Sequence, residues 1–303
     1  MTAGAARLAI FTVLKPLVDR HVETIQRNAI RSWLALRPRP EIVLFGDDTT
    51  AGLAASLDVR HVTDVTYSEH GAPLLNSVFP RAEELTASPF LAYVNADIIL
   101  LGGIAVAVER VARARARFLL AGSRWDLDLG EPLAFEPDWE RHLRALVDRD
   151  GCRHPPAGSD YFVFPRGFWG ELPPLALGRS SFDNWLIYRA RQTGDAVVDG
   201  SRAVLVVHQN HDYSHIGGEV ATWSGPDAKR NYELAGGAPA IYLLGDASHV
   251  LTRFGLLPSA LSPRHLGQRA RRLIERHDRL LTLSNRWGAL RDLRRRRARA
   301  ERA

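Results

Sequence analysis

The chain has 303 residues, of which 46% are hydrophobic and 24% charged, and this ordinary composition excludes a disordered or fibrous protein. Its length suits one α/β domain with an appendage. A single cysteine excludes an intramolecular disulfide, and the apolar runs are too short for a membrane span or a secretory signal. We therefore expect a cytoplasmic protein.

The net charge of +6 is unevenly distributed along the chain. Residues 261–303 contain 14 Arg and 4 acidic residues, whereas residues 1–260 contain 26 basic and 30 acidic residues. Apolar side chains at helical spacing among these arginines predict a basic amphipathic helix. We therefore expect a globular domain over residues 1–260 and an Arg-rich helical tail over residues 261–303. The tail is expected to pack on the domain or a partner, or to lie peripherally on the anionic inner face of a membrane, with no nucleic acid partner.

Strands and helices alternate in the first part of the chain. Apolar residues 8–14 predict a buried strand, and residues 19–36 have apolar side chains at helical spacing. A strand at 41–45, a helix at 50–57 and a short strand at 59–62 repeat this order. Such alternation predicts a Rossmann-like, mostly parallel sheet with helices on both faces.

The second part of the chain continues this pattern less regularly. Residues 79–87 predict a helix, and residues 90–94 a compact strand that ends at Asn95-Ala96-Asp97. Residues 126–156, with several acidic, Trp and Pro residues, are interpreted as an insertion beside the sheet. Short apolar runs predict further strands at 118–121, 161–164 and 203–207.

Polar residues that follow strands are the first candidates for a site, because open α/β sheets bind ligands at the carboxyl ends of their strands. Thr12 and Lys15 lie at the end of the first predicted strand, and Asp47 follows the second. Each is also compatible with ordinary turn or capping chemistry. They are therefore candidates for ligand binding that need support from other residues.

A metal site is indicated by residues at two further strand ends. Asn95 and Asp97 follow the strand at 90–94, and a carboxylate there suits Mg²⁺ or Mn²⁺. His208 and His211 follow the strand at 203–207, and imidazole is a good ligand for Mn²⁺ or Zn²⁺. These side chains are candidate metal ligands.

Two further carboxylates are candidates for acid–base chemistry. Asp160 precedes an aromatic strand, and Asp183 lies at the start of a predicted helix. Either could act as a base or cap a helix. For Asp183 the helix dipole would favour a carboxylate in the first turn, with Ser180 or Ser181 as the cap.

In this order, the motifs resemble the GT-A plan of nucleotide-diphospho-sugar glycosyltransferases, over roughly residues 8–216. That plan has a DXD motif, a glycine-containing acceptor loop, an xED motif and a C-terminal metal-binding histidine. The matching residues here are Asn95-Ala96-Asp97, Gly158-Ser159-Asp160, Phe182-Asp183-Asn184, and His208 or His211. The sequence departs from the plan at Asn95, which replaces the first acid of DXD, and at Phe182, which replaces the usual Glu of xED.

The resemblance implies a GT-A fold and a metal-dependent transfer of a sugar from a UDP- or GDP-sugar to a glycan, lipid-linked or small-molecule acceptor. It implies Mn²⁺ or Mg²⁺ held by Asp97 with His208 or His211. Asp183 is the expected base of an inverting reaction, and Asp160 is expected to orient hydroxyls. The expected donor-binding residues are Thr12, Lys15, Asp47, Arg81, Asn95 and Asp97, and the expected sugar contacts are Tyr161, Trp185 and Tyr213.

Three alternatives remain open from the sequence. The first is a retaining GT-A enzyme, in which Asp183 need not be a base. The second is a zinc hydrolase built on His208, His211 and His215, although the HExxH signature is absent. The third is a catalytically inactive protein that binds a sugar nucleotide.

Overall fold

A nine-stranded sheet lies at the centre of the computed structural model, which describes residues 8–17, 19–155, 158–211 and 223–275. Its strand order is β13-β12-β10-β6-β9-β4-β1-β2-β3. Only β9 and β13 run antiparallel to their neighbours, so the sheet is mostly parallel, as predicted. The bounds are β1 Leu8–Val13, β2 Glu41–Phe45, β3 Arg60–Val62, β4 Phe90–Val94, β6 Phe118–Ala121, β9 Tyr161–Pro165, β10 Ala196–Asp199, β12 His249–Thr252 and β13 Gly255–Pro258.

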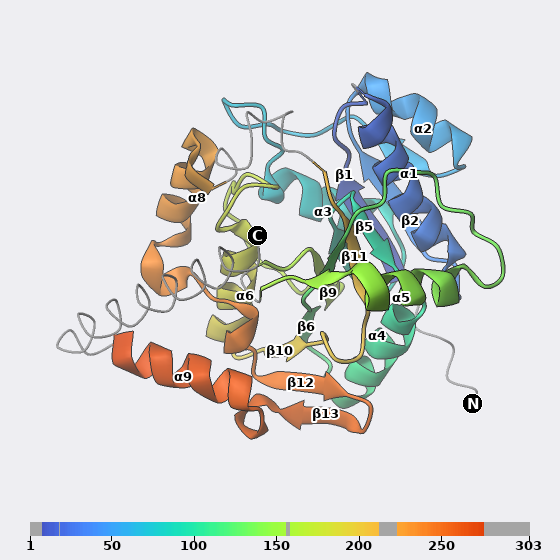
Figure 1. Cartoon of the computed structure of the whole chain (residues 1–303). Coiled ribbons are helices and arrows are strands. Elements are labelled where there is room, and N and C mark those ends of the chain that lie inside the picture. The colour runs from blue at the N-terminus through green and yellow to red at the C-terminus, as the bar shows by residue number, and fades with distance from the viewer. Residues whose placement is uncertain (1–7, 18, 156–157, 212–222, 276–303) are drawn as a thin grey trace, which may run out of the picture.

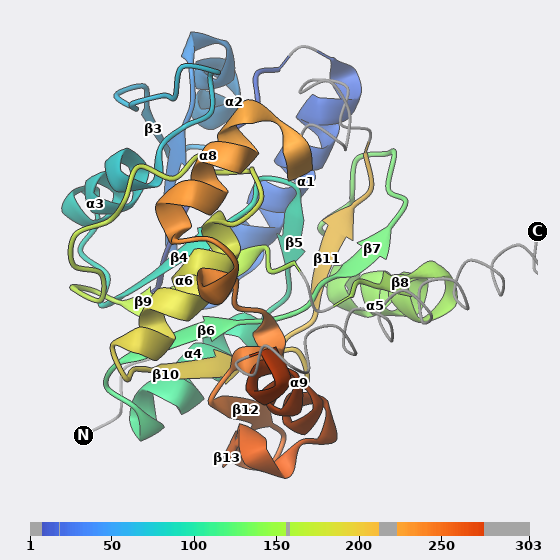
Figure 2. The same ribbon diagram turned by 90° about the vertical axis from the view of Figure 1, so that its left-hand side faces the viewer.

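Helices cover both faces of this sheet (Figures 1 and 2). On one face lie α1 (Arg20–Ala35), α2 (Ala51–Ser56) and α4 (Gly103–Ala114), and on the other α3 (Leu75–Leu85), α6 (Phe182–Gln192) and α8 (Pro226–Ala235). The central strands are apolar almost throughout because side chains on both of their faces are buried. The predicted α/β class, with a mostly parallel sheet between two layers of helices, is confirmed. Short 3₁₀ turns lie at Asp48–Thr50, Ala238–Ala240, Leu244–Asp246 and Ser259–Leu261.

A second, four-stranded sheet lies beside the first, in the order β5-β11-β7-β8. Its strands are β5 (Ile98–Leu100), β11 (Val206–Gln209), β7 (Trp125–Leu127) and β8 (Cys152–Arg153). The segment predicted as an insertion supplies β7, β8 and the helix α5 (Trp139–Asp150). This segment therefore adds two strands and a helix to the fold, and its strand β7 pairs with β11, which is distant in sequence.

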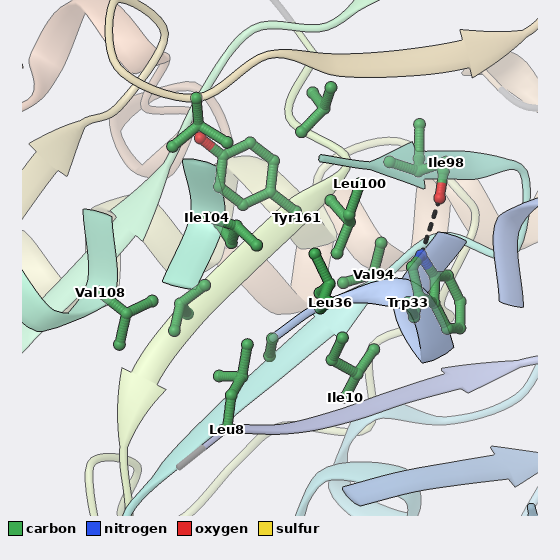
Figure 3. Packing of buried hydrophobic residues seen from close by; sticks show 14 of the residues in the cluster. Leu8, Ile10, Trp33, Leu36, Val94, Ile98, Leu100, Ile104, Val108 and Tyr161 are labelled. Atoms are coloured by element: carbon green, nitrogen blue, oxygen red, sulfur yellow. Dashed lines mark hydrogen bonds between the residues drawn. The ribbon is translucent and has the colours of Figure 1, made fainter. Parts of the chain in front are cut away.

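The core beneath α1 joins the two sheets (Figure 3). Trp33 of α1 is fully buried, and its indole Nε1 donates a hydrogen bond of 2.9 Å to the carbonyl of Ile98. A buried indole N–H needs such a partner. Because Ile98 directly follows Asp97, this contact also fixes the backbone beside a candidate metal ligand.

Two predicted boundaries are corrected by the structure. The helix expected at 79–87 is α3, which begins at Leu75, because the buried side chains at 75, 78, 79 and 82 outweigh the hydrogen bond lost at Pro80. The strand expected at 203–207 is β11, which extends through Gln209 because it pairs with both β5 and β7. His208 is therefore part of a strand rather than of the loop that follows it.

The start of the predicted tail packs on the domain as α9 (Pro263–Glu275). Arg272 of this helix pairs with Asp246 at 3.0 Å, and its guanidinium lies 4.3 Å from the ring centroid of Tyr242. Residues 276–303 lie outside the described part of the chain, so the membrane contact and the cytoplasmic location stay predictions. None of the described helices is both long and apolar enough to cross a bilayer.

We predict that Trp33→Ala lowers the free energy of unfolding by about 3–5 kcal/mol, because it leaves a cavity and an unpaired carbonyl at Ile98. Urea denaturation followed by circular dichroism measures this value. Val106→Ala, at a position that is 56% exposed on α4, is the control and should change stability by less than about 0.5 kcal/mol. Equal effects of the two substitutions would contradict the role assigned to Trp33.

Candidate active site

A cavity of about 700 Å³ opens at the carboxyl ends of the parallel strands. Lys15 lines it from the end of β1, Asp47 from the end of β2, and Asn95 and Asp97 from the end of β4. Asp160, which precedes β9 and lies beside Asn95, and Asp183, in the first turn of α6, also line it. The structure therefore brings most of the predicted polar residues to one cavity, as expected for an open α/β sheet.

Asp97, His208 and His211 form a group in which one potential ligand atom of each residue lies within 4.8 Å of the others. The Nε2 atom of His211 lies 3.0 Å from Asp97 Oδ2, and that of His208 lies 3.9 Å from the same oxygen. One carboxylate and two imidazoles are a donor set that suits Mn²⁺ or Zn²⁺.

Strand pairing in the second sheet brings these three residues together. In the antiparallel pair of β5 and β11, His208 lies opposite Ile98, the residue after Asp97. The buried Gln209 then donates from its side-chain Nε2 to the Asp97 carbonyl at 3.2 Å and to the Ile25 carbonyl of α1 at 2.8 Å. The backbone of Asp97 is thus held by both the strand and a helix.

Asp126, a residue that the sequence analysis missed, lies beside His208 in the pairing of β7 with β11. His208 Nδ1 lies 3.3 Å from Asp126 Oδ1, opposite the side on which Nε2 approaches Asp97. Asp126 also contacts Arg124 Nε at 2.8 Å and His154 Nδ1 at 2.8 Å. A carboxylate behind an imidazole fixes its orientation for metal binding. The polar–apolar alternation over residues 124–127 was the available signal, because it predicts a strand with Arg124 and Asp126 on one face.

The Asp97 carboxylate is suited to a cation. Burial alone would raise its pKa, but the Lys15 ammonium and the contacts with both histidines hold the pKa well below its usual range. Its Oδ1 atom is buried and has no hydrogen-bond partner among the described residues. A buried, ionised oxygen without a partner is costly, so the residues here fit a divalent cation.

One carboxylate oxygen of Asp160 is held by other side chains, whereas its Oδ2 has no hydrogen-bond partner among the described residues. Its Oδ1 accepts from Asn95 Nδ2 at 2.9 Å and from Arg124 Nη1 at 2.8 Å, and its carbonyl accepts from the backbone N–H of Asn95. Arg124 therefore neutralises Asp160 inside the cavity wall. Asn95, which replaces the first acid of the DXD pattern, has a structural partner in Asp160.

Asp183 is in the opposite electrostatic situation. Burial raises its pKa to about 7, and the nearby Asp160 carboxylate adds to this effect. Ser181, which precedes α6, has a φ of 77°, a left-handed conformation that is uncommon for serine and that directs the chain into the first helical turn. A carboxyl group with a pKa near 7 is suited to proton transfer at neutral pH.

The predicted sugar contacts are not supported. Tyr161 is fully buried in the core, and Trp185 is 8% exposed and stacks against Trp169, so neither ring lines the cavity. The structure does not bring these two rings to the cavity, because the period-2 and helical patterns that identified their elements also place them in the core. Tyr213 lies outside the described residues. The aromatic rings that line the cavity are instead those of Tyr67 and Trp223, among others, which are 42% and 58% exposed.

Two of the predicted donor contacts, Thr12 and Arg81, also lie outside the cavity lining. Thr12 is fully buried within β1 and does not line the cavity, because alternate side chains of a strand point to opposite faces. Arg81 lies on α3, pairs with Glu84 at 2.9 Å and is outside the cavity lining. Asp47 and Lys15 do line the cavity. Asp47 also caps the 3₁₀ turn, because its carboxylate accepts a hydrogen bond from the N–H of Thr49.

The chain was compared with known proteins. No protein-family model matches it, and no curated protein is similar to it. Among solved structures of GT-A glycosyltransferases, GalNAc-T7 with UDP, GalNAc and Mn²⁺ is 16% identical, with a TM-score of 0.46 over 76% of this chain and 48% of that one. TarS 1-349 of S. aureus is 11% identical, with a TM-score of 0.31 over 43% of this chain and 40% of that one. The structure of TarS 1-349 in complex with UDP-GlcNAc is 10% identical, with a TM-score of 0.29 over 43% of this chain and 38% of that one.

The chain thus spans less than half the length of these structures. Likenesses this distant leave the function to be inferred from the site itself.

We predict that Asp183→Asn makes the protein more stable than the wild type at pH 8, and that this advantage vanishes toward pH 4. Folding raises the pKa of Asp183 from 3.8 to about 7, so the unfolding free energy of the wild type falls as the pH rises between these values and then levels. Urea denaturation of both proteins over this pH range measures the difference. Asp148→Asn, which removes an exposed carboxylate on α5, is the matched control. A difference that does not change with pH would contradict the raised pKa.

Proposed function

We propose that the chain is a metal-dependent glycosyltransferase that moves a sugar from a nucleotide-diphosphate sugar to an acceptor hydroxyl. The observation that carries this proposal is the meeting of Asp97, His208 and His211 within 4.8 Å, at the carboxyl edge of the sheet. The cavity of about 700 Å³ beside them is within the range of ordinary ligand sites. A UDP- or GDP-sugar is the proposed donor.

Asp97, His208 and His211 would hold Mn²⁺ or Mg²⁺. Such a cation, when bound, neutralises the negative charge that develops on the departing diphosphate. Lys15 lines the same part of the cavity and adds a second positive charge for the phosphates. Asp47 and Tyr67, farther along this wall, are proposed to contact the nucleoside.

Asp183 is proposed as the general base of an inverting transfer. Asp160 already accepts hydrogen bonds from Asn95 and Arg124, whereas Asp183 has a pKa near 7 and lines the cavity. In this role the Asp183 carboxylate removes the proton of the acceptor hydroxyl as that oxygen attacks the sugar. Asp160 then acts as a positioning residue for Asn95 and Arg124.

The acceptor is proposed to be a glycan, a lipid-linked molecule or a small molecule that presents a hydroxyl group. Trp223 borders the cavity near the N-terminus of α8 with an exposed ring. Aromatic rings with a free face suit the apolar faces of sugars. We therefore propose Trp223 in place of Tyr161 and Trp185 as a sugar contact.

We predict that Asp97→Ala abolishes Mn²⁺-dependent binding of the donor, because it removes the carboxylate of the ligand group. A panel of UDP- and GDP-sugars, screened for thermal stabilisation with and without Mn²⁺, first identifies the donor, and calorimetry then measures its affinity. The control Asp48→Ala removes an exposed carboxylate at the same sheet edge and should bind as the wild type does. Unchanged binding by Asp97→Ala would refute the metal site, and zinc retained through dialysis would favour the hydrolase alternative.

We also predict that Asp183→Asn lowers kcat/KM for sugar transfer by about 10²–10⁴-fold while donor binding is kept. In the wild type, kcat/KM should rise with pH up to about 7 and then level, because only the ionised carboxylate accepts a proton. Transfer to the best acceptor of a screened panel is measured across pH, with the anomeric configuration of the product read by NMR. Near-normal turnover of the variant, or retention of configuration, would remove the assignment of Asp183 as the base.

A further inference from the structure

The Lys15 side chain occupies the edge of the metal-ligand group. Its Nζ lies 3.0 Å from Asp97 Oδ2 and 3.0 Å from His211 Nε2, which are atoms of two of the three proposed ligands. The side chain is 23% exposed and lines the cavity. An ammonium group thus sits against the atoms that a divalent cation would need.

The backbone of Lys15 is held in place by the core. The side chain of Gln26, fully buried in α1, accepts a hydrogen bond of 2.8 Å from the Lys15 N–H and donates one of 3.0 Å to the Lys15 carbonyl. The preceding residue, Leu14, donates to the Phe45 carbonyl at 2.7 Å. Because these hydrogen bonds fix the backbone of Lys15, only its flexible side chain can move within the site.

The ammonium and a divalent cation compete for the same lone pairs. Lys15 donates to Asp97 Oδ2, and in the His211 tautomer protonated on Nδ1 it also donates to Nε2. A cation bound to these two atoms would face the ammonium across a partly buried space, where like charges repel strongly. Binding of the cation therefore requires the Lys15 ammonium to leave Asp97 and His211.

We propose that Lys15 is an internal competitor that keeps the affinity of the site for a divalent cation low until a diphosphate enters the cavity. The diphosphate gives the ammonium a new anionic partner and gives the cation further oxygen ligands. Metal and nucleotide therefore bind cooperatively, each raising the affinity of the other by the same factor. This inference rests on the proposed function for the identity of the diphosphate ligand.

The test is a titration of the full chain with Mn²⁺, alone and with saturating UDP or GDP, in which free Mn²⁺ is measured by electron paramagnetic resonance. In the wild type, the nucleotide should tighten Mn²⁺ binding by about tenfold or more. In Lys15→Met, Mn²⁺ alone should bind about tenfold more tightly than to the wild type, and the effect of the nucleotide should shrink. Lys15→Gln keeps a hydrogen-bond donor without the charge and should behave in the same way.

The matched control is Lys229→Met, which removes the only other lysine of the chain, at an exposed position on α8. It should bind Mn²⁺ as the wild type does. The competitor role would be overturned if the two Lys15 variants bound Mn²⁺ alone no more tightly than the wild type does. It would also be overturned if the nucleotide had no effect on Mn²⁺ binding by the wild type. Neither result would contradict the metal site itself. Failure of wild type and variants alike to bind Mn²⁺ would overturn this proposal together with the metal site.

Discussion

The pairing of β5 with β11 is the interaction on which the candidate site depends. It places His208 opposite Ile98, and so brings an imidazole to a carboxylate 111 positions earlier in the chain. Gln209 and Trp33 then hold the backbone at the start of β5, by donating hydrogen bonds to the carbonyls of Asp97 and Ile98. Without this pairing, the residues after β4 and those after β10 would belong to separate parts of the molecule.

The carboxylates of the site differ in pKa because their surroundings differ. Asp97 lies among Lys15 and two histidines and is held ionised, whereas burial raises the pKa of Asp183 to about 7. Groups whose surroundings push their pKa values apart can take different roles in one reaction. The proposed division, with charge binding on the sheet side of the cavity and proton transfer on the α6 side, rests on this difference.

Arg124 bridges two carboxylates on the sheet side of the cavity. Its guanidinium contacts Asp126, which orients His208, and Asp160, which holds Asn95. The carboxylates nearest the candidate metal ligands are thereby balanced by a partly buried positive charge, which lowers the cost of gathering these acids at one edge. Arg124 thus contacts the surroundings of both the candidate metal ligands and Asn95.

Much of the fold and part of the site could be predicted from the sequence. The strands at 41–45, 90–94 and 118–121 were located to the residue, because buried parallel strands are short continuous apolar runs between turn residues. Asp97, His208 and Asp183 were identified by their place at the ends of such elements. The aromatic rings that line the cavity were not identified, because a buried ring and a ring that faces a cavity have the same local pattern, as Tyr161 shows.

Local patterns in the chain were enough to predict the α/β class, the edge of the sheet where the candidate site lies and most of its charged residues, since apolar periodicity and polar strand ends are local properties. Which of these residues lie close together depends on the folded domain. The second sheet, the orientation of His208 by Asp126 and the contact of Lys15 with Asp97 and His211 all join residues far apart in sequence. Such contacts depend on strand pairing and packing across the whole domain, which no local pattern specifies.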